Sequence, residues 1–162
     1  MKIIVTSDTH IKSTSKKQFP QKLLEACQTA DLIIHAGDWS SPEVHTALSS
    51  IAPVKGVYGN VDGEDIQTIV PEKEIIEVGG YTIGIVHGHG EKKTTEQRAR
   101  DAFASNDLDV LIFGHSHIPF MRYAGKTLLL NPGSPTDKRK LPYYSFALLE
   151  LGKTIECKII FF

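Results

Sequence analysis

Short apolar runs bounded by glycine and polar residues recur along the first two-thirds of the chain and predict buried β-strands. The first run is Lys2-Ile3-Ile4-Val5-Thr6, in which β-branched residues dominate. Between such runs, apolar residues recur every three or four positions, which is the spacing of an amphipathic helix. Strands are expected at Lys2–Thr6, Asp31–His35, Pro53–Tyr58 and Asp109–Phe113, and helices are expected to begin near Pro20, at Ser41–Glu43 and at Thr94, where Thr94 and Gln97 can form a capping box.

Pairs of apolar runs joined by short turns predict hairpins in the remaining segments. Gly79-Gly80 joins Glu74–Val78 to Tyr81–Val86. Two further pairs are Met121–Tyr123 with Lys126–Leu130, and Tyr143–Leu151 with Thr154–Phe162. Alternating strands and helices followed by strands alone predict an α/β fold with an antiparallel component. A chain of 162 residues has the size of one domain, and we expect a single domain over residues 1–162.

Composition and charge narrow the class of partner. The net charge of -1 gives no electrostatic footprint for duplex nucleic acid or for an anionic membrane. Cys27 and Cys157 stand far apart without a CxxC spacing, and we expect both to be buried, reduced thiols. The N-terminal segment has no pattern of a cleaved signal peptide, and no run approaches the roughly 20 apolar residues of a membrane span, so a cytoplasmic location is expected.

Carboxylate, imidazole and amide side chains stand at the ends of five predicted strands. Taken one at a time, such residues are often turn residues or surface histidines. Because ligands of open α/β sheets bind at the carboxyl ends of the strands, the recurrence at five strand ends favours a metal site. A set of N and O donors of this size, without cysteine, suits two divalent cations. The candidate ligands are Asp8, His10, Asp38, Asn60, His87, His115 and His117.

The same residues carry a resemblance to a known family. In order along the chain, Asp8-x-His10, Gly37-Asp38, Gly59-Asn60, His87 and Gly114-His115-Ser116-His117 resemble the motif series of calcineurin-like metallophosphoesterases. The short chain, His87-Gly88-His89 and Asn131-Pro132-Gly133-Ser134 resemble the small bacterial and archaeal phosphodiesterase branch of that family. The resemblance implies a sandwich of two mixed β-sheets flanked by helices, with metals at one edge.

The resemblance also implies how the ligands divide between two cations. One cation would be bound by Asp8, His10, Asp38 and His117, and the other by Asp38, Asn60, His87 and His115, with Asp38 bridging both. Members of the family often use manganese, and iron, nickel, zinc and magnesium are other occupants. A hydroxide between the two cations would attack phosphorus. The amide of Asn60 is neutral, so net positive charge would remain to stabilise the transition state.

Two positions depart from the pattern of many relatives. Ser41 stands where a GDxxD element has its second aspartate, and Val61 stands where a GNHD element has its histidine. Because that histidine is the usual proton donor to the leaving group, the identity of the general acid stays open. His89 is either a catalytic residue that contacts the phosphate or donates a proton, or a solvent-exposed loop histidine. Asp62 is expected to support the ligands or to shape a turn.

The expected function is hydrolysis of phosphodiester bonds, in small-molecule or otherwise accessible substrates, by a two-metal phosphoesterase. A phosphomonoesterase of the same fold is one alternative. Another is a non-catalytic protein-binding scaffold, because a retromer subunit resembles this branch but has lost several ligand histidines. The presence of all seven ligand residues favours the enzyme. Self-association into a homo-oligomer stays open at this stage.

Overall fold

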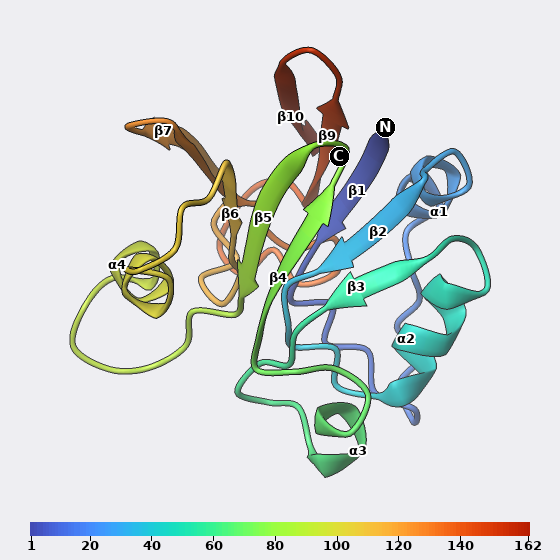
Figure 1. Ribbon diagram of the computed structural model, residues 1–162. Helices are drawn as coiled ribbons and strands as arrows, with labels where there is room; N and C mark the ends of the chain where they lie inside the picture. Colours follow the sequence, from blue (N-terminus) through green and yellow to red (C-terminus); the bar gives the residue numbers. More distant parts are fainter.

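Two five-stranded β-sheets lie face to face in the computed structural model, which describes all 162 residues (Figure 1). The first sheet has the strand order β10-β9-β1-β2-β3, and the second has the order β4-β5-β6-β8-β7. The first comprises β1 (Lys2–Thr6), β2 (Leu32–His35), β3 (Val54–Gly56), β9 (Ser145–Leu151) and β10 (Ile155–Phe161). The second comprises β4 (Lys73–Val78), β5 (Tyr81–Val86), β6 (Val110–Ile112), β7 (Phe120–Ala124) and β8 (Thr127–Asn131).

Each sheet combines parallel and antiparallel pairs. In the first sheet β1 is parallel to β2 and β2 to β3, whereas β9 is antiparallel to both β1 and β10. In the second sheet β5, β6 and β8 are parallel, and the edge strands β4 and β7 are antiparallel to their neighbours. The predicted α/β fold with an antiparallel component is therefore confirmed, and so is the sandwich of two mixed sheets implied by the resemblance.

The inner faces of the two sheets form one hydrophobic core. Ile3 and Val5 of β1 and Ile83 and Ile85 of β5 are fully buried in it. Because successive residues of a strand point to opposite faces, Ile4 lies on the other face and is buried in a separate cluster that covers the outer side of the first sheet. A strand buried on both faces needs apolar residues throughout, which explains the unbroken apolar run at the start of the chain.

Helices cover the outer faces of the sandwich (Figure 1). The helices α1 (Gln21–Cys27), α2 (Pro42–Ser49) and α3 (Glu64–Gln67) pack on the first sheet, and α4 (Thr95–Ala102) packs on the second. The capping box predicted for Thr94 and Gln97 is present at the start of α4. No helix combines the length and the apolar character needed to cross a membrane. Cys27 and Cys157 are both free, and Cys27 is buried as predicted, whereas Cys157 is only half-buried because it lies on the edge strand β10.

Two local features differ from the pattern-based expectation. The strand expected over Pro53–Tyr58 is confined to Val54–Gly56. The Val57 N–H still donates to the His35 carbonyl of β2 at 3.1 Å, but the Tyr58 N–H donates to the Pro71 carbonyl at 2.9 Å and so leaves the ladder. The helix α3 has only four residues, and a single turn is too short to establish a helical period in the sequence. Both features lie in the segment that carries Asn60, next to the candidate site.

Candidate metal centre

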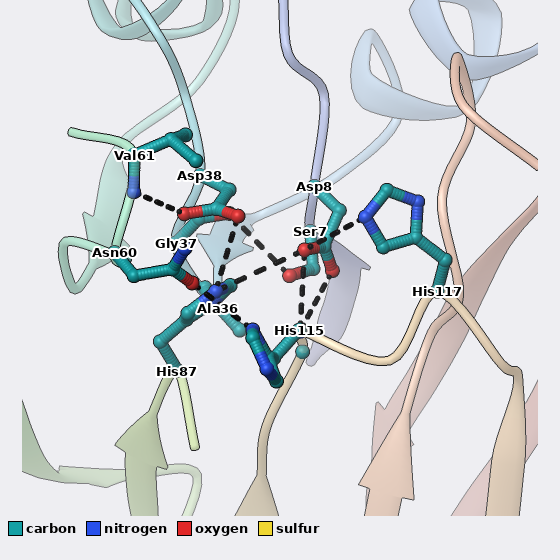
Figure 2. Close-up of polar contacts among 12 residues, drawn as sticks. Ser7, Asp8, Ala36, Gly37, Asp38, Asn60, Val61, His87, His115 and His117 are labelled. Carbon is teal, nitrogen blue, oxygen red and sulfur yellow. Dashed lines mark hydrogen bonds and ion pairs between the residues drawn. The ribbon is translucent and has the colours of Figure 1, made fainter. Parts of the chain in front are cut away.

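The carboxyl ends of β1, β2, β3, β5 and β6 converge, and the loops that follow them bring the predicted ligands together (Figure 2). Several of these ligands have a left-handed backbone, which residues with a side chain rarely adopt and which costs on the order of 1 kcal/mol or more at each position. The residues concerned are Asp8, His10, Asp38, His115 and His117, with φ between 46° and 67°. Strain concentrated in one set of ligand-bearing loops is typical of a functional site.

The ligands form two clusters. One ligand atom each of Asp8, His10 and His117, the first donor group, lies within 4.8 Å of the other two. The same holds for Asp38, His87 and His115, the second donor group. The seventh predicted ligand joins the second group, because the Asn60 Oδ1 lies 3.0 Å from the His115 Nδ1. All seven sequence-predicted ligands are thus in two neighbouring groups, in the division that the resemblance implies.

Within the first donor group, His10 Nε2 and His117 Nε2 are 3.2 Å apart, and His117 Nε2 is 3.4 Å from Asp8 Oδ1. Two nitrogens bound at about 2.1 Å to one tetrahedral cation lie roughly 3.4 Å apart. The spacing of the two imidazoles therefore fits a shared divalent cation.

Asp38 lies between the two donor groups. Its Oδ2 is 3.5 Å from His10 Nε2, in the first donor group, and 3.3 Å from His87 Nε2, in the second. Its Oδ1 accepts the backbone N–H of Val61 at 3.1 Å, which fixes the carboxylate plane (Figure 2). One oxygen is thereby held by the protein, and the other faces both groups. This is the geometry that a bridging carboxylate requires.

The hydrogen bonds of two histidines direct their free nitrogens into the site. His87 Nδ1 lies 2.7 Å from the Ala36 carbonyl and His117 Nδ1 lies 2.5 Å from the Asp137 carbonyl. A carbonyl only accepts, so both Nδ1 atoms carry the hydrogen, which leaves each Nε2 as a potential metal ligand. His87 Nε2 is buried without a hydrogen-bond partner. A divalent cation would satisfy this buried nitrogen and the carboxylate oxygens around it.

The electrostatics of the cluster also suit cations. Burial lowers the pKa of His10 and of His115 to about 4, so both imidazoles are neutral near pH 7. Burial alone would raise the pKa of Asp38, but the nearby His87 imidazole outweighs it and lowers that pKa to about 2. Burial raises the pKa of Asp8 to about 6, although neighbouring histidines oppose the shift. Burial would lower the pKa of His87, but its hydrogen bond to Asp38 and the charges of Asp8 and Asp38 outweigh burial and raise it. Near neutral pH the centre therefore offers ionised carboxylates and the neutral imidazoles of His10 and His115, and a cation bound at His87 would displace its proton.

Asp62 ties together the loops after β2 and β3. Its carboxylate accepts the backbone N–H groups of Asp38 at 2.9 Å, Ser40 at 2.8 Å and Gly59 at 2.7 Å. This confirms the prediction that Asp62 shapes a turn and supports the ligands. Gly59 is required at this crossing, because a Cβ there would collide with the Asp38 carboxylate.

His35 has a supporting role that the sequence did not reveal. The ring is fully buried and stacks on Trp39, with centroids 3.7 Å apart. Its Nδ1 accepts the Gly37 N–H at 3.2 Å, so its Nε2 carries the hydrogen and donates to Thr9 Oγ1 at 3.1 Å. One neutral imidazole therefore joins the loop that carries Asp8 and His10 to the loop that carries Asp38. The sequence placed His35 only as the last residue of a strand, and nothing in its spacing distinguished it.

His89 and Val61 lie at the margin of the second donor group. The His89 ring is half-buried, with its centroid 5.6 Å from that of His87 and 6.4 Å from that of His115. Its Nδ1 is buried without a hydrogen-bond partner. Val61 is 46% exposed and contacts the site through its backbone N–H alone. His89 is thus near the ligands, while its catalytic role stays a prediction.

Comparison with known proteins places this site in a family of hydrolases. Residues 1–154 match the calcineurin-like phosphoesterase superfamily domain, and the chain belongs to that family. The resemblance drawn from the motifs is therefore confirmed, and the class of protein is that of the metallophosphoesterases.

Individual relatives agree with this assignment. The chain is 37% identical over 161 residues, 99% of its length and 92% of the relative's, to a probable metallophosphoesterase of Methanothermobacter thermautotrophicus. It is 28% identical over 145 residues, 82% of its length and 83% of the relative's, to a phosphodiesterase of Methanocaldococcus jannaschii. Among solved structures, Vps29 of Entamoeba histolytica complexed with Zn²⁺ superimposes with a TM-score of 0.75 at 26% identity, over 99% of each chain.

Proposed function

We propose that this protein is a phosphodiesterase that works with two divalent cations, with Mn²⁺ as the preferred metal. The observation that carries the proposal is Asp38, whose Oδ2 faces a histidine nitrogen of each donor group at 3.3 to 3.5 Å. In this proposal the cations are held by Asp8, His10, Asp38 and His117 and by Asp38, Asn60, His87 and His115. When bound, the pair supplies Lewis-acid charge and lowers the pKa of a water molecule between them.

The charge of the ligand set suits an anionic substrate. Asp8 and Asp38 are its only carboxylates, and the other five ligands are neutral imidazoles and an amide. Two divalent cations carry four positive charges, so this set leaves a net charge of about +2. A phosphodiester carries a single negative charge and is attracted to such a site. Because the Asn60 amide is neutral, it does not reduce the positive charge of the cations, and that charge stabilises the transition state.

Proton transfer to the leaving group needs a residue other than Val61. His89 lies beside the second donor group in the same loop as His87. We propose that it donates a hydrogen bond to the phosphate or a proton to the departing oxygen. Burial lowers the pKa of His89, which His87 lowers further, so near pH 7 the ring is largely neutral and still has one N–H to donate. Arg98 holds this loop in place by donating its Nε–H to the Gly88 carbonyl at 2.8 Å.

The direct test compares metal-stripped and Mn²⁺-reconstituted protein on matched substrates. We expect the stripped protein to be inactive, and the reconstituted protein to hydrolyse bis-p-nitrophenyl phosphate with a higher kcat/KM than p-nitrophenyl phosphate. Stripped protein that keeps full activity would exclude the metal mechanism. A higher kcat/KM for the monoester would assign the chain to the phosphomonoesterases. If the protein hydrolyses neither compound, and no member of a broader panel of diesters, the alternative of a non-catalytic protein-binding scaffold would be favoured.

A further inference from the structure

Arg139 approaches the first donor group from the loop between β8 and β9. Its Nη2 lies 3.1 Å from His117 Nε2, and its Nε lies 3.4 Å from His117 Nδ1. The arginine side chain is 60% exposed, whereas the side chain of His117 is only 1% exposed. The guanidinium therefore lies against a candidate metal ligand on the side that faces solvent.

The loop that carries Arg139 is fastened to the first donor group. Ser134 Oγ donates to the Asp8 carbonyl at 2.8 Å and accepts the Asp137 N–H at 2.8 Å. The Asp137 carbonyl in turn accepts the His117 Nδ1–H, and Thr136 Oγ1 donates to the Thr9 carbonyl at 2.5 Å. These bonds tie both ends of the ligand set to the same short segment. The position of Arg139 is thus set by the site itself.

The donors of Arg139 lack oxygen acceptors in the protein. A guanidinium has five N–H donors and no acceptor, so its preferred partner is an anion. The closest carboxylate oxygen, Asp137 Oδ2, is 3.8 Å from its Nε, which exceeds hydrogen-bond distance. By contrast, Arg122 is paired with Glu96, and Arg98 donates to Gly88 and to two further oxygens.

A cation bound at His117 Nε2 would displace the contact between Arg139 and His117. The lone pair of His117 Nε2 can accept a hydrogen bond from the guanidinium or bind a cation, but it cannot do both at once. With a cation bound, the donors of Arg139 are released at the edge of the site.

We propose that Arg139 is a substrate-binding residue that donates hydrogen bonds to a non-bridging oxygen of the scissile phosphate beside His117. This inference rests on the proposed function. A planar guanidinium can give two parallel N–H bonds to phosphate, which fixes the orientation of the group as well as its charge. Loss of such charge-assisted bonds weakens binding by about 10- to 100-fold. We expect Arg139→Ala to raise KM for a diester by this factor, with a smaller change in kcat.

The test measures binding of inorganic phosphate to the Mn²⁺-saturated protein by titration calorimetry, together with KM for bis-p-nitrophenyl phosphate. Arg139→Ala should raise both the phosphate Kd and KM by about 10- to 100-fold, and Arg139→Lys should restore part of the affinity. Arg122→Ala is the matched control, because Arg122 is an exposed arginine on β7 that pairs with Glu96, and it should leave both values unchanged.

Three results would overturn the inference. The first is an unchanged phosphate Kd in Arg139→Ala, and the second is a wild-type protein that binds no phosphate. A variant that loses Mn²⁺ affinity but binds phosphate normally at saturating metal would also overturn it, because Arg139 would then only shield His117. If the wild type hydrolyses no diester but binds phosphate through Arg139, the proposed function fails and the anion-binding role stands.

Discussion

Asp62 offers a test of whether the loops after β2 and β3 must be held together for the site to bind metal. Its carboxylate is 5% exposed and accepts three backbone N–H groups, from Asp38, Ser40 and Gly59. Two of these bonds end on Oδ2 and one on Oδ1. Asp62→Asn keeps the shape of the side chain but leaves only one oxygen as an acceptor.

The cost of Asp62→Asn follows from this geometry. If the amide oxygen takes the place of Oδ2, the N–H groups of Asp38 and Gly59 stay bonded, and the amide NH₂ faces the Ser40 N–H. A fully buried donor without a partner costs roughly 1–3 kcal/mol of folding stability, and because the Ser40 N–H is only partly buried we expect a loss near the lower end, about 1 kcal/mol. Because the loops carry Asp38 and Asn60, we also expect the affinity for Mn²⁺ to fall by about 10- to 100-fold, as is typical when support of a ligand is lost. Asp62→Ala removes all three acceptors and should cost more.

The assay combines urea unfolding of the metal-free protein with Mn²⁺ titration of the folded protein. Asp107→Asn is the control, because Asp107 is 79% exposed and pairs only with Lys126 on the surface. We expect this control to match the wild type in both measurements. Wild-type stability and wild-type Mn²⁺ affinity in Asp62→Asn would show that the three hydrogen bonds do not organise the site.

Three further predictions concern the bridge, the general acid and a buried histidine. Asp38→Asn should lower kcat/KM and metal stoichiometry more than His10→Gln, because Asp38 faces both donor groups whereas His10 belongs to one, and the opposite order would refute the bridge. Val61→His should raise kcat/KM for alkyl diesters more than for nitrophenyl diesters, which have a good leaving group, and an equal effect on both would show that protonation is not limiting. Burial holds the pKa of His35 well below its usual value, so the unfolded chain takes up a proton below about pH 6.5 that the folded protein refuses. Stability should therefore fall with decreasing pH below about 6.5, and should fall less steeply in His35→Gln; equal slopes would mean that His35 does not titrate on unfolding.

The sequence predicted the ligands because each follows a local pattern. Asp8, Asp38 and His87 come directly after apolar runs, and a strand end can be recognised from the run alone. The third strand was predicted to end too late, and α3 was not predicted at all. Both errors have the same origin, because a strand of three residues and a helix of four are too short to produce a periodic pattern in the sequence. The division of the ligands into two groups came from the resemblance to a family. Spacing along the chain does not reveal that the loops of the first sheet face those of the second.

The contributions of His35 and Arg139 could not be predicted from local pattern. His35 is part of a strand, and its role depends on a contact to Thr9 that forms only when β1 and β2 pair. Arg139 lies 22 residues beyond His117 in a loop without regular structure. Its approach to the ligand depends on how Ser134 fastens that loop to Asp8. Such long-range contacts are properties of the folded chain.

A crystal structure of the Mn²⁺-loaded protein, with anomalous scattering recorded for manganese, would test whether two cations share Asp38. We expect two anomalous peaks about 3.5–4 Å apart, one beside each donor group, with Asp38 within bonding distance of both. A single peak, or two peaks of which only one contacts Asp38, would contradict it.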